Sequence, residues 1–143
     1  MYNSPTYGKL DETGLKTRVS RYMSQNKDAL YRIIVGSDSQ KNKSGMHDFV
    51  AALVIHRVGE GGIYFWKRDL IKQRMSLKER MYREALMSLE SAEHIVELFR
   101  DNGISKYNVE IHVDIGQNGL TRDLITEIVG MVRANGYAAK IKP

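Results

Sequence analysis

The chain has 143 residues, of which 42% are hydrophobic and 27% charged, which is enough for one soluble domain with a buried core. Because it has no cysteine, disulfides and thiolate zinc sites are excluded. No apolar stretch reaches the about 18 residues needed to cross a bilayer, and the N-terminus lacks a signal-peptide pattern, so we expect no membrane association and a cytoplasmic location. The formal charge of +5 favours anionic partners, nucleic acid above all.

The N-terminal part of the chain is expected to hold one helix. Residues 1–9 show no periodic pattern and are expected to be disordered. After them, apolar residues recur at helical spacing and predict a short amphipathic helix before the first strand. These residues are Leu15, Val19, Tyr22 and Met23.

Three strands are predicted next, over residues 33–38, 49–58 and 63–69, which are rich in β-branched and aromatic types. The glycine-rich segment 59–62 supplies the permissive residues of a hairpin loop. The three strands are therefore expected to form an antiparallel meander.

A long helix is predicted from Leu77 to about Asp101. Ser76 and Glu79 have the spacing of a capping box at its start. One stripe of this helix is apolar and is expected to pack on the sheet. Glu84 lies at the edge of that stripe, whereas Glu90, the second choice for a functional acid on this helix, points the other way.

A strand over residues 109–114, a helix over about 120–134 and a last strand over 137–142 complete the prediction. This order of helices and strands predicts an α/β protein with a five-stranded mixed sheet. Three antiparallel strands come first, and helices connect them to the parallel strands that follow. A right-handed crossover would place the fourth strand beside the first. No linker divides the chain, so we expect a single domain over residues 1–143.

Two aspartates, Asp38 and Asp114, each close a predicted strand. If these strands are parallel neighbours, both acids lie at the same end of the sheet. With Glu84 they would repel one another by about 4 kcal/mol for each pair at 4 Å, so a cation is expected. Oxygen ligands favour Mg²⁺ or Mn²⁺ over Zn²⁺, and two such ions suit phosphodiester cleavage. The alternative is that each aspartate only caps a turn.

The segment 67–83 concentrates positive charge, with seven basic residues against two acidic ones. It is expected to contact nucleic acid, unless it is only a solvated surface. Tyr64, Phe65 and Trp66 nearby could stack on a base, although at least one of them must be buried because alternate strand residues face opposite sides. The seven basic residues are Lys67, Arg68, Lys72, Arg74, Lys78, Arg80 and Arg83.

Together with the order of elements, four stretches of the sequence resemble the YkuK family of predicted ribonuclease H-like proteins: residues 35–40, the 49–65 hairpin, residues 111–116, and residues 134–136 followed by 141–143. The resemblance implies a ribonuclease H-like fold with an Asp on the first strand, a Glu on the long helix and an Asp on the fourth strand. These roles fall on Asp38, Glu84 and Asp114, as catalytic residues and ligands of Mg²⁺ or Mn²⁺. Ser39 and His112 are candidate supporting residues. The implied activity is a metal-dependent nuclease acting on RNA, DNA or a hybrid.

One departure from the family pattern affects the expected activity. Family members continue beyond the Lys-Pro pair with an acidic residue and a helical segment, whereas this chain stops at Pro143. We therefore expect the C-terminal part of the family domain, with a fourth carboxylate, to be missing and the two-metal site to be incomplete. The alternative function is a non-catalytic nucleic-acid-binding or interaction module that keeps the fold.

Overall fold

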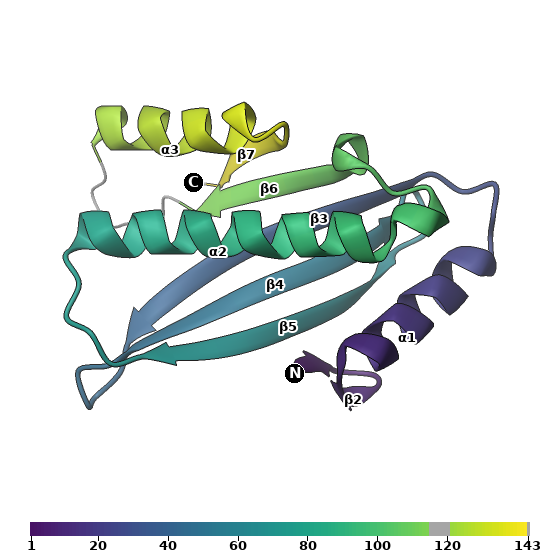
Figure 1. Cartoon of the computed structure of the whole chain (residues 1–143), viewed down its shortest axis with the longest axis horizontal. Coiled ribbons are helices and arrows are strands. Elements are labelled where there is room, and N and C mark those ends of the chain that lie inside the picture. The colour runs from purple at the N-terminus through teal and green to yellow at the C-terminus, as the bar shows by residue number, and fades with distance from the viewer. Residues whose placement is uncertain (115–120, 143) are drawn as a thin grey trace.

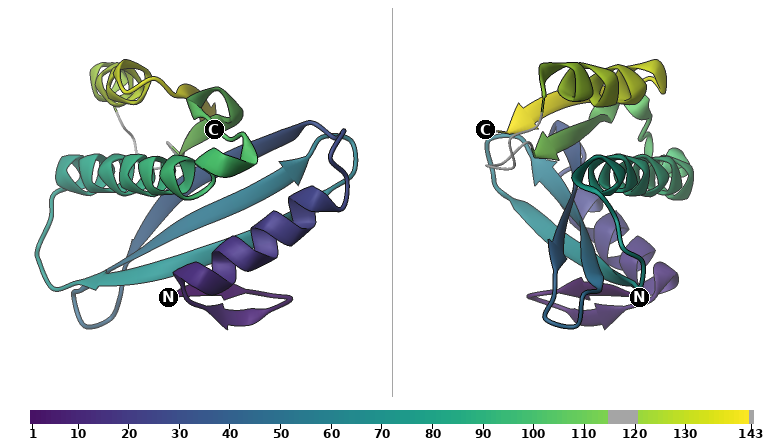
Figure 2. Two further views of the ribbon diagram at one scale, coloured as in Figure 1. Left: turned by 45° about the vertical axis from the view of Figure 1, so that its right-hand side comes forward. Right: turned by 90° about the vertical axis from the view of Figure 1, so that its left-hand side faces the viewer.

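In the residues that the computed structural model describes, 1–114 and 121–142, a seven-stranded mixed sheet carries three α-helices on one face (Figures 1 and 2). The strand order is β2-β1-β5-β4-β3-β6-β7. The chain is therefore an α/β protein with an N-terminal helix, as predicted, and the structure adds two short strands to the five expected.

The predicted meander is confirmed by β3 (Tyr31–Lys41), β4 (His47–Arg57) and β5 (Gly62–Ile71), which pair antiparallel. The turn between β4 and β5 needs its glycines. Gly61 has a φ of 89°, which favours glycine. A Cβ at Gly62 would lie 2.7 Å from the backbone oxygen of Ile55, so a larger residue would push the two strands apart.

The parallel half of the sheet consists of β6 (Val109–Asp114) and β7 (Ala138–Lys142). β6 pairs parallel with β3, and β7 pairs parallel with β6. The crossover from the meander to β6 contains α2 (Leu77–Leu98), and α3 (Arg122–Ala134) joins β6 to β7. The predicted placement of the fourth strand beside the first is confirmed.

Helix α2 begins as the capping box predicts. The Ser76 hydroxyl accepts a hydrogen bond from the Glu79 N–H at 3.2 Å, and the Glu79 carboxylate accepts one from the Ser76 N–H at 3.4 Å. The helix ends at Leu98 and is followed by a 3-10 turn, Arg100–Asn102, close to the predicted end. The predicted start of the next helix at residue 120 lies outside the described residues.

Replacing Ser76 with alanine is expected to lower the free energy of unfolding by about 1 kcal/mol, because the first turn of α2 loses an acceptor for its unpaired N–H groups. Urea denaturation followed by circular dichroism measures the change. Ser44→Ala, at an exposed serine in the β3–β4 turn, is the control and should leave stability unchanged. Equal stability of the two variants would mean that the capping box contributes nothing.

The N-terminal residues differ from the expectation of disorder. Tyr2–Ser4 form β1 and Gly8–Leu10 form β2, which pair with each other, and β1 extends the sheet beyond β5. Burial explains why this segment is ordered, since the Tyr2 side chain is only 8% exposed and belongs to the core. The predicted helix follows as α1 (Glu12–Ser24), with Asp11 as its N-cap.

The core lies between the sheet and the helices. Alternate residues of β3 and β4 point toward it, as do apolar residues of α1 and α2. The fully buried side chains include Ile33, Val35, Ile55, Phe65, Leu15, Val19, Ile95 and Ile111. None of the three described helices covers the opposite face of the sheet (Figure 2). Among the described residues, no helix has both the length and the apolar character of a membrane span.

Candidate active site

Asp38 lies inside β3, not at its end. The predicted strand stopped at Asp38, but the real strand continues to Lys41 because residues 39–41 pair with residues 47–49 of β4. The alternative that Asp38 caps a turn after the strand is therefore wrong. Its exposed side chain points to the open face of the sheet, and its Oδ1 accepts a hydrogen bond from the Ser39 N–H at 2.8 Å.

Ser39, the next residue, points the other way, toward α2. Its hydroxyl donates a hydrogen bond to Glu84 Oε2 at 2.5 Å. Arg80, one turn earlier on α2, donates from Nε to the same hydroxyl at 3.2 Å and from Nη2 to the Ser39 backbone oxygen at 3.0 Å. Ser39, a candidate supporting residue from the sequence, is thus in direct contact with Glu84.

Glu84 is a buried acid with a perturbed pKa. The residue is only 7% exposed, and it lies between α2 and the sheet. The pKa of Glu84 is raised to about 7, mainly by burial and also by the charges of Asp38 and Asp114, although the Ser39 hydrogen bond and Arg80 oppose the rise. Glu90, the second choice on this helix, is exposed. Glu84 is therefore the α2 acid that interacts electrostatically with both aspartates.

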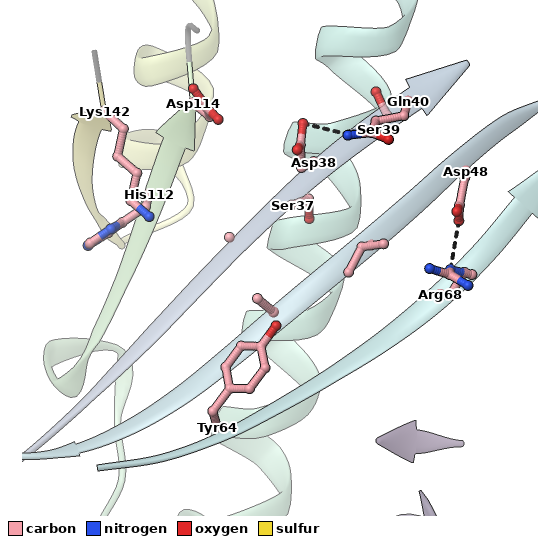
Figure 3. Close-up of a pocket in the computed structure, with 13 residues that line it drawn as sticks. Ser37, Asp38, Ser39, Gln40, Asp48, Tyr64, Arg68, His112, Asp114 and Lys142 are labelled. Carbon is pink, nitrogen blue, oxygen red and sulfur yellow. Dashed lines mark hydrogen bonds and ion pairs between the residues drawn. The ribbon is translucent and has the colours of Figure 1, made fainter. Parts of the chain in front are cut away.

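Asp114, the last residue of β6, lines a cavity with each of the other two acids. It lines an open cavity of about 470 Å³ together with Asp38, and it lines a much smaller pocket together with Glu84. Figure 3 shows Asp38 and Asp114 on the side of the sheet away from α2, near the ends of their strands. All three acids therefore lie at the end of the sheet where β3 and β6 finish.

The three acids do not form a closed metal site in this arrangement. Asp38 faces the open side of the sheet, whereas Glu84 lies on the helix side. Among the residues that the structure describes, no group of three or more histidines or acids is close enough to hold a metal ion. The donor set still suits Mg²⁺ or Mn²⁺, because it contains only carboxylate oxygens whose mutual repulsion a cation would relieve.

His112 supports a different acid from the one expected. It shares the open face with Asp114, but its Nε2 donates a hydrogen bond to Glu110 Oε1 at 3.3 Å. Arg32 and Lys140 contact the same carboxylate at 3.0 and 3.4 Å. Burial opposes ionisation of Glu110, but these partners outweigh it and hold its pKa below the ordinary value. This cluster was not predicted, although residues 110, 112 and 114 alternate along the predicted strand and so share one of its faces.

The comparisons with known proteins agree with this architecture. The family model described as ribonuclease H-like matches residues 15–143. The chain belongs to the ribonuclease H-like family. It is also 32% identical over 138 residues to the uncharacterized protein YkuK of Bacillus subtilis (strain 168), covering 88% of this chain and 79% of that protein. No solved structure matches the chain significantly. The resemblance to YkuK read from the sequence is confirmed.

In this ribonuclease H-like chain, three of the seven predicted nucleic-acid-binding residues have partners within the fold. Arg68 forms an ion pair with Asp48 at 3.1 Å, a pairing that the sequence did not reveal. The ammonium group of Lys67 lies 5.3 Å from the centroid of the Tyr2 ring, and Arg80 bonds to Ser39, as described above. The others are exposed and form no ion pair with any described residue: Lys72, Arg74, Lys78 and Arg83.

Proposed function

We propose that the chain is a metal-dependent nuclease that hydrolyses phosphodiester bonds of RNA, DNA or a hybrid. The observation that carries the proposal is the position of Asp114, which shares one cavity with Asp38 and another with Glu84. Two aspartates and a buried glutamate at one end of a ribonuclease H-like sheet are a suitable ligand set for Mg²⁺ or Mn²⁺. The ions, when bound by Asp38, Glu84 and Asp114, would activate water and stabilise the leaving oxygen.

Other side chains would fix the orientation of the Glu84 carboxyl and attract the phosphate backbone. Ser39 holds Glu84 Oε2, and Arg80 holds Ser39, so the orientation of the buried carboxyl is fixed by β3 and α2 together. With a pKa of about 7, Glu84 is present both with and without its proton at neutral pH, so a nearby positive charge would favour the carboxylate. The exposed Lys72 and Arg74, just after β5, can attract the phosphate backbone to this end of the sheet.

Cleavage assays with labelled single-stranded RNA and DNA, duplexes and hybrids test the proposal. We expect at least one of these substrates to be cut in Mg²⁺ or Mn²⁺ and none in EDTA. The alternative is the non-catalytic nucleic-acid-binding module, in which the three acids hold no catalytic ion. Binding without cleavage in either metal would establish this alternative and overturn the proposal.

Divalent cations are also expected to raise the melting temperature at pH 8, by about 3 °C or more at saturating Mg²⁺ or Mn²⁺, because a ligand that binds only the folded state stabilises it. Thermal unfolding with and without the cation measures the rise. It should disappear in Asp114→Asn and persist in Asp101→Asn, at an exposed aspartate beyond the far end of α2. An equal rise in both variants would place cation binding elsewhere.

A further inference from the structure

The open face of the sheet carries two aromatic side chains of β5. Tyr64 is 40% exposed and Trp66 is partly exposed, whereas Phe65 between them is fully buried in the core. This settles which of the three aromatics is inside. Figure 3 shows Tyr64 standing on the same side of the sheet as Asp38 and Asp114, away from α2. The exposed Tyr64 ring and the partly exposed Trp66 ring, over which the Arg68 guanidinium lies at 5.7 Å from the centroid, therefore share a face with the candidate active site.

Small residues leave a hollow between Tyr64 and the aspartates, and Trp66 lies next to Ala52 at its margin. Trp66 pairs with Ala52 on β4, which in turn pairs with Gly36 on β3, so the floor beside Trp66 carries almost no side chain. The cavity of about 470 Å³ extends over this floor from Tyr64 to Asp38. Its volume lies within the range of about 300 to 1,000 Å³ that is usual for ligand pockets.

The two rings are spaced in a way that suits unpaired bases. Tyr64 and Trp66 are two residues apart on one strand, which places them about 6.6 Å apart along it. Aromatic side chains on an open sheet stack on single-stranded bases in this manner, because each base presents a free ring face. In a duplex the bases cover one another, so the rings could not reach them.

Basic residues surround the end of the sheet where β3, β5 and β7 finish. Exposed basic residues lie at or just after the ends of β3, β5 and β7 and at the start of α2. Of the three acids that line the cavity, Asp48 is paired with Arg68. Glu110, which does not line it, is paired with Arg32 and Lys140. A polyanion with aromatic bases complements both the charge and the rings. The exposed basic residues at this end are Lys41, Lys43, Lys72, Arg74, Lys78 and Lys142.

We propose that the open face binds a single-stranded segment of nucleic acid, whose bases stack on Tyr64 and Trp66 and whose backbone continues across the cavity toward Asp38 and Asp114. This inference rests on the proposed function and deepens it, because it names an unpaired strand as the substrate class. A protein partner fits less well, since the cores of protein interfaces are depleted of charged residues, and this face carries both Asp38 and Arg68 at the cavity.

The single tryptophan of the chain makes the proposal measurable, because its fluorescence reports on this face alone. The full chain is titrated in EDTA with an oligothymidylate longer than the about 4 to 16 nucleotides of a typical single-strand site. The same strand annealed to oligoadenylate supplies the duplex. We expect saturable quenching of Trp66 by the single strand and clearly weaker binding of the duplex.

Variants at Tyr64 test whether its aromatic ring is needed for binding of the single strand. Tyr64→Ala is expected to weaken binding of the single strand about tenfold, whereas Tyr64→Phe keeps the ring and should bind nearly as the wild type does. Tyr107→Ala is the matched control, because Tyr107 is fully exposed and lies in the turn before β6, at the opposite end of the sheet. Circular dichroism checks that each variant is folded.

Three results would overturn the proposal: equal binding of duplex and single strand, unchanged affinity in Tyr64→Ala, or a Trp66 signal that depends on protein concentration alone. The last would identify a self-association surface. Since EDTA prevents metal-dependent cleavage, the titration is independent of nuclease activity. Binding that requires Tyr64, in a chain that cuts nothing, would leave this inference standing and the proposed nuclease refuted.

Discussion

Replacing Asp38 with asparagine is expected to reduce Mg²⁺- or Mn²⁺-dependent cleavage by at least about 100-fold. Mutating a residue that only hydrogen-bonds to a metal ligand typically lowers metal affinity or activity about 10- to 100-fold. Asp38 is proposed to bind the ion directly, so the loss of activity should be at least as large. The fold should tolerate the change, because the side chain is exposed and asparagine can still accept a hydrogen bond from the Ser39 N–H. Initial rates on the best-cleaved substrate measure the effect.

Asp38→Asn should also lower the pKa of Glu84, because one of the two negative charges that raise it is removed. This second readout tests whether the two acids interact even if no substrate has been found. Asp101→Asn should change neither the rate nor the pKa, since that residue lies in the 3-10 turn after α2. Undiminished cleavage in Asp38→Asn would remove Asp38 from the catalytic centre.

Local sequence signals were sufficient to predict most of the fold. The Ser76–Glu79 pair located the start of α2, and the alternation of apolar residues located the strands of the meander. They did not reveal β1, because a strand of three residues is too short to show a periodicity of its own. Its order depends on pairing with β5 and on burial of Tyr2, which are both tertiary effects.

The candidate site was predictable in its residues but not in their orientation. An apolar run ending at Asp38 suggested a strand end, yet Ser39 continues the strand by pairing with Phe49. Ser37 and Ser39 are buried, but serine gives no hydrophobic signal. The sequence therefore named Ser39 only as a candidate supporting residue and did not predict its hydrogen bond to Glu84. Likewise the sequence required that one of three consecutive aromatics be buried, and only the packed sheet shows that it is Phe65.

Glu84→Gln is expected to make the protein more stable at alkaline pH, although it removes a proposed metal ligand. In the folded chain the pKa of Glu84 rises from its ordinary value of 4.5 to about 7, mainly through burial. Between these two values the folded state keeps a proton that the unfolded state has lost, so stability falls as the pH rises. Well above pH 7 the full cost is present: the two pKa values differ by about 2.5, which at about 1.4 kcal/mol for each pH unit amounts to about 3.5 kcal/mol.

Glutamine is neutral at every pH and can still accept the hydrogen bond from the Ser39 hydroxyl, so the variant escapes this cost. In EDTA, its advantage over the wild type in urea unfolding should grow from less than about 1 kcal/mol at pH 5 to about 3 kcal/mol at pH 8. Glu90→Gln, on an exposed position of the same helix, should show no such trend. Saturating Mg²⁺ should narrow the gap, because a cation beside Glu84 stabilises the carboxylate only in the wild type. A constant difference across this pH range would mean that Glu84 is ionised in the fold at little cost, and the electrostatic argument for a cation at this end of the sheet would then fail.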